Sequence, residues 1–165
     1  MILGRNPTWA LRDQMVDKLA RLKLIGFRAA GYWKVAAGEL TCELNELERA
    51  NNALYAFVVD GELMYLGKTV KSLRTRMTGY RRPGPTQSTN IRNNRHIVDC
   101  LAAGKRVEVY ALPDNGLLHY GGFHLNLAAG LEDSLIRDLC PPWNGGRKEP
   151  QSDEITPETE IGENP

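Results

Sequence analysis

Side chains suited to anion binding and proton transfer recur in the second third and the late part of this 165-residue chain. Two tyrosines, Tyr55 and Tyr65, lie ten residues apart, Arg76 follows them, and a carboxylate, Glu132, comes much later. A guanidinium can bind a phosphate through two parallel hydrogen bonds, a phenol can exchange a proton, and a carboxylate can hold a divalent cation. The four groups could act together only if the fold brings them to one spot.

A β-hairpin is predicted around the two tyrosines, because apolar stretches of strand type at residues 54–59 and 62–67 flank an Asp-Gly turn. If the loop has two residues, the tyrosines point to opposite faces of the hairpin. If it has three, with Gly61 in the left-handed third position, Val58 pairs with Glu62 and the tyrosines lie directly across from each other. We expect the three-residue loop and both phenols on one face.

Arg76 is predicted on the inward face of a short helix at residues 72–79. It shares that face with three side chains at helical spacing, Leu73, Met77 and Tyr80. Arg74 lies off the face. A guanidinium that points inward is costly unless it has an anionic partner. The alternative is an arginine whose stem packs while its head reaches solvent.

Glu132 is predicted in an inward position of a later helix, which Asn126 could cap. The buried stripe of that helix holds Ala128, Leu131, Leu135, Ile136 and Leu139. Asp133 lies off the stripe. An inward carboxylate calls for a partner or a metal ion. A salt bridge to an inward arginine such as Arg76 is the alternative to a metal.

Taken in order, these motifs resemble the signature of the GIY-YIG nuclease family. The hairpin carries Ala-Leu-Tyr at residues 53–55 and then Tyr-Leu-Gly-Lys at residues 65–68, with Ala and Leu in place of the first Gly and the Ile. The short helix carries Leu-x-x-Arg, which ends at Arg76. The late part of the chain carries Glu132 and then Pro-x-Asn, which ends at Asn144.

The resemblance implies a site that hydrolyses phosphodiester bonds with one divalent ion, Mg²⁺ or Mn²⁺. Arg76 would bind the oxygens of the transition state, and Glu132 would hold the ion. Tyr55 would act as the base, its pKa lowered from about 10 by Lys68, Arg76 and the ion. Two further residues would orient water, phosphate or the site itself through hydrogen bonds, Tyr65 and Asn144.

Basic residues cluster in the middle of the chain, although the formal net charge is only +1. From residue 68 to residue 106 there are ten Lys or Arg and one acid, Asp99. Such clustering is expected for a phosphate-rich partner, DNA with RNA left open, and a solvated surface is the alternative. The candidate nucleic-acid contacts are Lys68, Lys71, Arg74, Arg81, Arg82, Arg92 and Arg95.

The three histidines are weaker candidates for catalytic or metal-binding residues. A helix over about residues 91–103 is expected to expose Arg92 and His96 and to bury Ile97, Val98 and Leu101. Some restriction-type GIY-YIG nucleases use an Arg-x-x-x-His pair, so His96 is a further catalytic candidate, with a solvated pair as the alternative. His119 and His124 are expected to face each other across a Gly-Gly turn. A polar rim is favoured there over a metal site, because no third ligand is visible.

The predicted fold class is α/β, in the α+β sense, with a three-stranded, mainly antiparallel sheet flanked by helices. We expect this nuclease-like domain at residues 51–146, and the resemblance covers roughly residues 53–146. An N-terminal helix and hairpin at residues 1–50 would form an extension that grips DNA or packs as a lid. An acidic tail at residues 147–165 is expected to be disordered.

The expected function is therefore a metal-dependent DNA endonuclease. The rival hypotheses are a catalytically silent nucleic-acid-binding module and a partner-recruiting subunit of a DNA repair or defence complex. Widely separated cysteines without zinc spacing predict reduced thiols, Cys42, Cys100 and Cys140. The sequence shows no signal peptide and no transmembrane run, so a cytoplasmic protein without membrane contact is expected. The oligomeric state is left open.

Overall fold

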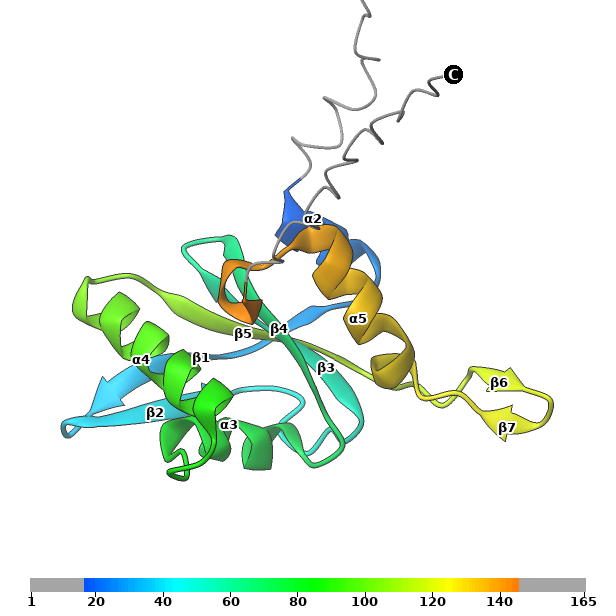
Figure 1. Cartoon of the computed structure of the whole chain (residues 1–165), viewed down its shortest axis with the longest axis horizontal. Coiled ribbons are helices and arrows are strands. Elements are labelled where there is room, and N and C mark those ends of the chain that lie inside the picture. Colours follow the sequence, from blue (N-terminus) through cyan, green and yellow to red (C-terminus); the bar gives the residue numbers. More distant parts are fainter. Residues whose placement is uncertain (1–16, 146–165) are drawn as a thin grey trace, which may run out of the picture.

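The computed structural model describes residues 17–145 (Figure 1). In chain order its elements are α2 (Lys18–Leu24), β1 (Arg28–Ala36), β2 (Glu39–Leu44), β3 (Ala53–Val59), β4 (Glu62–Thr69), α3 (Leu73–Arg81), α4 (Ser88–Ala102), β5 (Val107–Pro113), β6 (His119–Tyr120), β7 (Phe123–His124), α5 (Leu127–Leu139) and the 3₁₀ helix η1 (Pro142–Asn144). The predicted acidic tail and the predicted start of the first helix lie outside the described residues.

The main sheet has five strands in the order β2-β1-β5-β3-β4, and every neighbouring pair is antiparallel. The predicted α+β class is confirmed, but the predicted strand number of three is wrong. The predicted strands form the β5-β3-β4 part. The hairpin of β1 and β2 joins them because β1 pairs with β5, with Trp33 opposite Val107. The division of the chain at residue 50 stays a prediction.

Helices cover both faces of this sheet (Figure 1). On one face α3 and α4 pack on the strands, and that core includes Tyr55, Phe57, Tyr65, Met77 and Ile97. On the other face α2 and α5 pack on the strands, and that core includes Leu22, Leu54, Ala56, Leu66 and Leu139. Strand β3 lies inside the sheet between β5 and β4, and all seven of its residues are buried. This explains why its sequence is a continuous apolar run rather than an alternating one.

The β3–β4 hairpin turns through two residues, so the predicted three-residue loop is wrong. Val59 pairs with Glu62, and the loop residues Asp60 and Gly61 both have positive φ, 48° and 88°. This is the backbone of the favoured primed hairpin turn. A bulge then shifts the register, because Val58 pairs with Leu63 whereas Phe57, the preceding residue of β3, pairs with Tyr65.

The bulge puts the two tyrosines back on one face of the hairpin, which the two-residue loop alone would not do. One extra residue in β4 changes the parity of the side chains beyond it. Tyr55 therefore pairs with Gly67 rather than with Tyr65, yet the two phenols lie in the same core cluster, with ring centroids 6.2 Å apart. The prediction of both phenols on one face is confirmed, although its register was wrong.

Helix α4 presents a different buried side from the predicted one. Ile97 is fully buried and Leu101 is half-buried, but Val98 is 38% exposed. Two asparagines, Asn90 and Asn93, complete the buried side instead. Among the described residues, no helix combines the length and apolarity that crossing a membrane requires.

Candidate active site

Two phenols and a guanidinium form one hydrogen-bonded cluster between β3 and α3. Arg76 donates from Nε to the hydroxyl of Tyr55 at 2.7 Å and from Nη2 to the hydroxyl of Tyr80 at 2.8 Å. The two hydroxyls lie 2.6 Å apart. The predicted inward orientation of Arg76 is confirmed, and its partners are phenol oxygens.

Local structure explains why this cluster forms. Ser72 caps α3 by accepting a hydrogen bond from the backbone of Thr75. One helical turn separates Arg76 from Tyr80, so both side chains lie on the same face. Gly67 of β4 leaves the room that Tyr55 needs, because a Cβ there would lie 2.7 Å from the Tyr55 hydroxyl. Any side chain at residue 67 would thus displace the phenol.

The hydrogen bonds leave one phenol proton unused within the cluster. Each phenol oxygen accepts a hydrogen bond from Arg76, and one hydroxyl donates to the other. The accepting hydroxyl keeps a proton that neither the guanidinium nor the other phenol uses. If that hydroxyl lost its proton, the phenolate would receive hydrogen bonds from both the guanidinium and the other phenol.

Burial raises the pKa of both phenols above the ordinary value of 10, and Arg76 opposes the rise only in part. The predicted lowering of the Tyr55 pKa is therefore wrong for the free protein. The side chain of Tyr55 is completely buried, and burial disfavours the phenolate. Lys68, which was expected to help, instead pairs with Glu132.

These raised pKa values predict a loss of stability at alkaline pH. The unfolded chain releases the protons of Tyr55 and Tyr80 from about pH 10, while the folded chain retains them, so the free energy of unfolding falls as the pH rises above that value. Burial also raises the pKa of Cys42 from 9.0 to about 12, which extends the fall to lower pH. We expect urea unfolding between pH 7 and 11 to show this decline, with a shallower slope in Tyr80→Phe. An equal slope in the variant would contradict it.

Tyr65 contributes a ring rather than a hydrogen bond to the cluster. It stacks on Phe57 with ring centroids 5.5 Å apart and meets Tyr80 edge-on at 6.2 Å. Its hydroxyl takes no part in the network of Tyr55, Arg76 and Tyr80. Its predicted orienting role stays a prediction.

Glu132 lies beside the edge strand β4 and forms an ion pair with Lys68. The Nζ–Oε2 distance is 2.6 Å, and the Glu132 side chain is only 16% exposed. A partnered, inward carboxylate was expected, but the partner is Lys68 and not Arg76. The bond to Glu132 raises the pKa of Lys68 above its ordinary value.

The carboxylate of Glu132 and the phenol cluster lie on opposite faces of the sheet and do not touch, so the expected convergence of these groups on one spot is wrong for the free protein. Helix α5, which carries Glu132, packs on the face away from Tyr55. Two consecutive residues of β4 connect the two groups, since Gly67 lies against Tyr55 and Lys68 against Glu132. Because β4 is an edge strand, a ligand that reached all of these groups would have to lie across that edge.

Asn144 closes part of the same edge. Its amide nitrogen donates to the carbonyl of Leu66 at 2.7 Å, and its carbonyl oxygen accepts from the amide of Leu66 at 2.8 Å. The side chain thus takes the place of a neighbouring strand at one residue and fixes η1 against β4.

Replacing Asn144 by alanine is expected to destabilise the fold by about 2 kcal/mol, because it leaves both backbone groups of Leu66 without these partners. Urea unfolding measures this effect. Asn115→Ala is the matched control, since Asn115 bonds only locally, to the amide of Leu117 in an exposed loop. Equal stability losses in the two variants would contradict the structural role.

The contacts of His96 do not involve the phenol cluster. Its ring stacks on Trp143, with centroids 4.9 Å apart and an interplanar angle of 13°. Arg92 donates to the carbonyl of Trp143 at 3.2 Å. Arg92 is exposed as predicted, but His96 is half-buried rather than free on the outer side. Both residues hold η1, and the catalytic role of His96 stays a prediction.

Most candidate nucleic-acid contacts already have acidic partners. Arg74 pairs with Glu48, and Glu39 lies 2.7 Å from Arg81 and 3.2 Å from Arg82. In the described part of the chain, three of the candidates pair with no carboxylate, Lys71, Arg92 and Arg95. The basic surface is therefore partly neutralised by its own chain.

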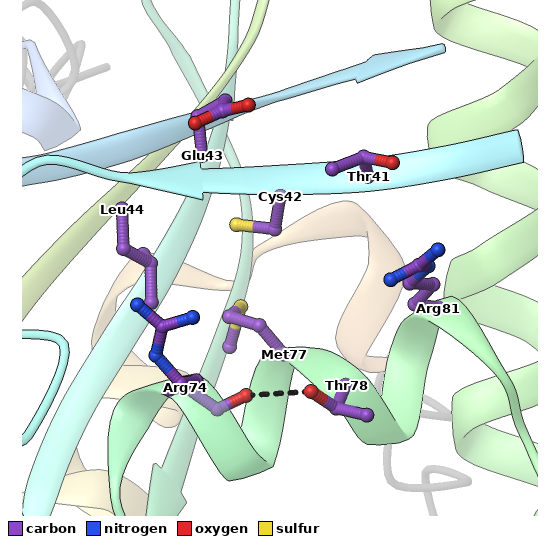
Figure 2. A pocket seen from close by; sticks show the side chains of 8 residues that line it. All are labelled: Thr41, Cys42, Glu43, Leu44, Arg74, Met77, Thr78 and Arg81. Atoms are coloured by element: carbon purple, nitrogen blue, oxygen red, sulfur yellow. Dashed lines mark hydrogen bonds between the residues drawn. The ribbon is translucent and has the colours of Figure 1, made fainter. Parts of the chain in front are cut away.

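A cavity of about 270 Å³ opens between β2 and α3 (Figure 2). Arg74 and Arg81 lie at its two ends, and Cys42 and Met77 lie between them (Figure 2). A second cavity of about 340 Å³ lies beside α5 and η1, where Ile136 and Pro142 contribute to its walls. Neither cavity includes Tyr55 or Glu132.

No cluster of three or more His, Cys, Asp or Glu among residues 17–145 is arranged to hold a metal ion. His119 and His124 are cross-strand partners as predicted, with ring centroids 5.7 Å apart. His124 also contacts Asp114 at 2.8 Å. Glu132 remains the one predicted metal ligand.

Tyr80 is the member of the cluster that the sequence interpretation missed as a functional residue. The sequence placed Tyr80 on the inward face of the helix with Arg76. Its position one helical turn after Arg76 was the signal that could have identified it as a partner of the guanidinium. A buried tyrosine usually finds a hydrogen-bond partner, and the guanidinium supplies one.

Comparison with known proteins gives a fold but no family. No family model matches the chain, and no curated protein does. A solved structure of a Glu-to-Ala variant of EndoII from bacteriophage T4 matches 78% of this chain and 98% of its own, with 24% identity and a TM-score of 0.60. The fold resembles that of T4 EndoII. The restriction endonuclease Hpy188I in complex with product DNA matches 94% of this chain and 99% of its own, with 14% identity and a TM-score of 0.44.

Proposed function

We propose that this chain is a metal-dependent endonuclease that hydrolyses DNA phosphodiester bonds with a GIY-YIG-type site. The observation that carries the proposal is the guanidinium of Arg76, which two buried phenols hold on the inward face of α3. The likeness of the fold to that of a phage endonuclease and the clustering of basic residues support it.

Arg76 is suited to stabilise a phosphoryl transition state. Tyr55 and Tyr80 fix its Nε and Nη2, so little reorganisation is needed when a phosphate arrives. The third nitrogen of the guanidinium, Nη1, takes no part in the two hydrogen bonds to the phenols. It lies beside Gly79, 4.0 Å from the point where a Cβ atom would stand if that residue had a side chain. The guanidinium can thus present Nη1 to a phosphate oxygen while the phenols keep its plane in place.

Tyr55 would take the proton of the attacking water. Arg76 and Tyr80 both bond its oxygen and would stabilise the phenolate. Burial makes that phenolate scarce at neutral pH, because it raises the pKa of Tyr55. The cleavage rate should consequently rise with pH through the neutral range.

Glu132 would hold one divalent cation at the edge of β4. The ammonium of Lys68 lies 2.6 Å from the carboxylate, so a divalent ion would take the place of that ammonium. Mg²⁺ commonly binds through one or two carboxylates, several waters and substrate phosphate oxygens, so a single carboxylate fits an ion brought together with DNA. Such an ion would stabilise the leaving oxygen as a Lewis acid. Lys68 would then be free to bind a phosphate.

DNA would lie along the basic side of α3 and the loop that follows it. Glu39→Gln should strengthen DNA binding about threefold at low salt, because it releases Arg81 and Arg82 for phosphate contacts. Fluorescence anisotropy with a labelled duplex measures the change. Glu62→Gln is the matched control, since Glu62 is an exposed acid outside the described ion pairs. Equal effects of the two variants would show that only net charge matters.

A supercoiled plasmid with Mg²⁺, with and without EDTA, tests the proposed function. We expect nicked or linear DNA with Mg²⁺ and none with EDTA, while RNA and a branched duplex run in parallel define the substrate. The engagement of Glu132 by Lys68 favours one rival, a silent nucleic-acid-binding module. Salt-dependent binding to the plasmid without cleavage in Mg²⁺ or Mn²⁺ would establish that rival instead.

A further inference from the structure

The helical glycine Gly79 leaves a space open between α3 and α4. Apart from its chain neighbours and the backbone of its own helix, only two described atoms lie within 4 Å of the point where a Cβ would stand. They are Nδ2 of Asn90, on α4, at 3.5 Å and Nη1 of Arg76 at 4.0 Å. Both nitrogens are hydrogen-bond donors. Gly79 and Arg76 are half-buried, so a ligand can reach this space from solvent.

Neither the backbone nor the packing of α3 requires glycine at this position. Gly79 is not among the glycines with positive φ, so an alanine could adopt its conformation. Distances of 3.5 and 4.0 Å are ordinary van der Waals contacts, so there is room for a methyl group. Glycine inside a helix is also less stable than alanine. A ligand that needs the space over Gly79 would account for this residue.

Both nitrogens have hydrogens to spare for such a ligand. Arg76 uses Nε and Nη2 for its bonds to the phenols, and Nη1 takes part in neither. In the described part of the chain, Nδ2 of Asn90 donates one of its two hydrogens, to Oε1 of Gln87 at 2.8 Å. The backbone amide of Gly84 donates to the same Gln87 oxygen at 3.1 Å. Because that oxygen is an acceptor, the Asn90 atom that faces it is the nitrogen.

We propose that the amide of Asn90 is a second donor to the phosphate group that Arg76 binds, and that this phosphate enters the space over Gly79. Since both nitrogens lie within 4.0 Å of one point, a single phosphate group can reach both. The guanidinium supplies the charge, and the neutral amide fixes how the phosphate is rotated. The inference rests on the proposed function, because it concerns the phosphodiester that Arg76 would bind there.

The side-chain amide resonance of Asn90 in the ¹⁵N-labelled full chain tests this contact without any need for cleavage. The pair of signals that disappears in Asn90→Ala identifies the resonance. With a short DNA duplex in EDTA, we expect the resonance to shift in the wild type. In Gly79→Ala at least half of that shift should be lost, because the added Cβ fills the space. A wild-type resonance that stays unmoved when the duplex binds, or a full shift in Gly79→Ala, overturns the proposal.

Gly130→Ala is the matched control, since Gly130 is an exposed glycine of α5 with no described atom within 4 Å of its Cβ position. It should keep the full shift of the Asn90 resonance. Both glycine variants should melt about 2–4 °C above the wild type, because alanine is the better helix former. Only Gly79→Ala should also slow single-turnover cleavage, by about a hundredfold. A lower melting temperature in Gly79→Ala would show that packing requires the glycine and would overturn the proposal.

The resonance and the cleavage assay separate a failure of this contact from a failure of the proposed function. A duplex that shifts the Asn90 resonance but is never cut in Mg²⁺ or Mn²⁺ would uphold the contact and refute the nuclease. Cleavage by a protein whose Asn90 resonance does not respond to the duplex would do the reverse. A shift caused by inorganic phosphate alone, and not by the duplex, would assign the space to a free anion and overturn the proposed contact with DNA.

Discussion

Arg76→Ala is expected to lower the single-turnover rate of DNA cleavage by about a thousandfold, which is typical when a fixed cationic donor to a phosphoryl transition state is lost. The phenols Tyr55 and Tyr80 hold this guanidinium in place, so no other side chain of the cluster can replace it. A labelled duplex with excess protein and Mg²⁺ measures the rate, and the affinity for the duplex should change far less.

Arg74→Ala is the matched control for this variant. Arg74 lies on the same helix two residues earlier, but it is exposed and pairs with Glu48. Its loss should weaken DNA binding slightly and leave the rate within about tenfold, since exposed ion pairs contribute little. Arg76→Lys tests geometry, because a lysine keeps the charge but cannot bond both phenols as a planar fork does. If Arg76→Ala cuts at the wild-type rate, the guanidinium has no catalytic role.

Glu132→Gln is expected to abolish the response of cleavage to Mg²⁺ and to lower the rate at least a hundredfold, because the amide is a weaker ligand for a hard cation. The substitution keeps the size of the side chain and leaves Lys68 without its ion-pair partner. Initial rates against Mg²⁺ concentration should saturate for the wild type and stay flat for the variant.

Asp133→Asn serves as the control for Glu132→Gln. Asp133 is the next residue of α5, but it is exposed and lies off the inward stripe, so its variant should retain the wild-type Mg²⁺ response. Cleavage with a normal Mg²⁺ curve in Glu132→Gln would count decisively against the metal site. A strong loss in both variants would indicate a general effect of negative charge near Lys68.

Helical spacing made the inward position of Arg76 predictable. Leu73, Met77 and Tyr80 define a buried stripe at i, i+4 and i+7 within eight consecutive residues, and local periodicity alone places Arg76 on it at i+3. The same reasoning placed Glu132 on the inward side of α5. Side-chain periodicity within one helix is a local property, so the sequence carries it directly.

Periodicity could not have predicted the strand register or the addition of β1 and β2 to the sheet. The bulge in β4 depends on how Tyr65 and Gly67 pack against β3, and the β1–β5 pairing joins segments some eighty residues apart, with Trp33 opposite Val107 among its pairs. Contacts at such separation leave no periodic trace in either segment. The sequence therefore indicated two phenols on one face without indicating the backbone that puts them there.

The sequence alone could not have predicted the direction of the Tyr55 pKa shift either. The sequence shows cations nearby in the chain, which would lower the pKa, but it does not show that the phenol is completely buried or that Lys68 points to Glu132. Burial is a property of the assembled core, and here it outweighs the nearby guanidinium. The partner of Glu132 depends on the same long-range assembly.

The most direct test of the proposed site is anomalous diffraction from Mn²⁺ in crystals of the Tyr55→Phe protein bound to a DNA duplex. We predict a Mn²⁺ peak at the carboxylate of Glu132 that shares one phosphate group with the guanidinium of Arg76 across the edge of β4. A phosphate that contacts only one of these two residues, or a Mn²⁺ peak away from Glu132, would contradict the proposal that groups from both faces of the sheet act on a single phosphodiester.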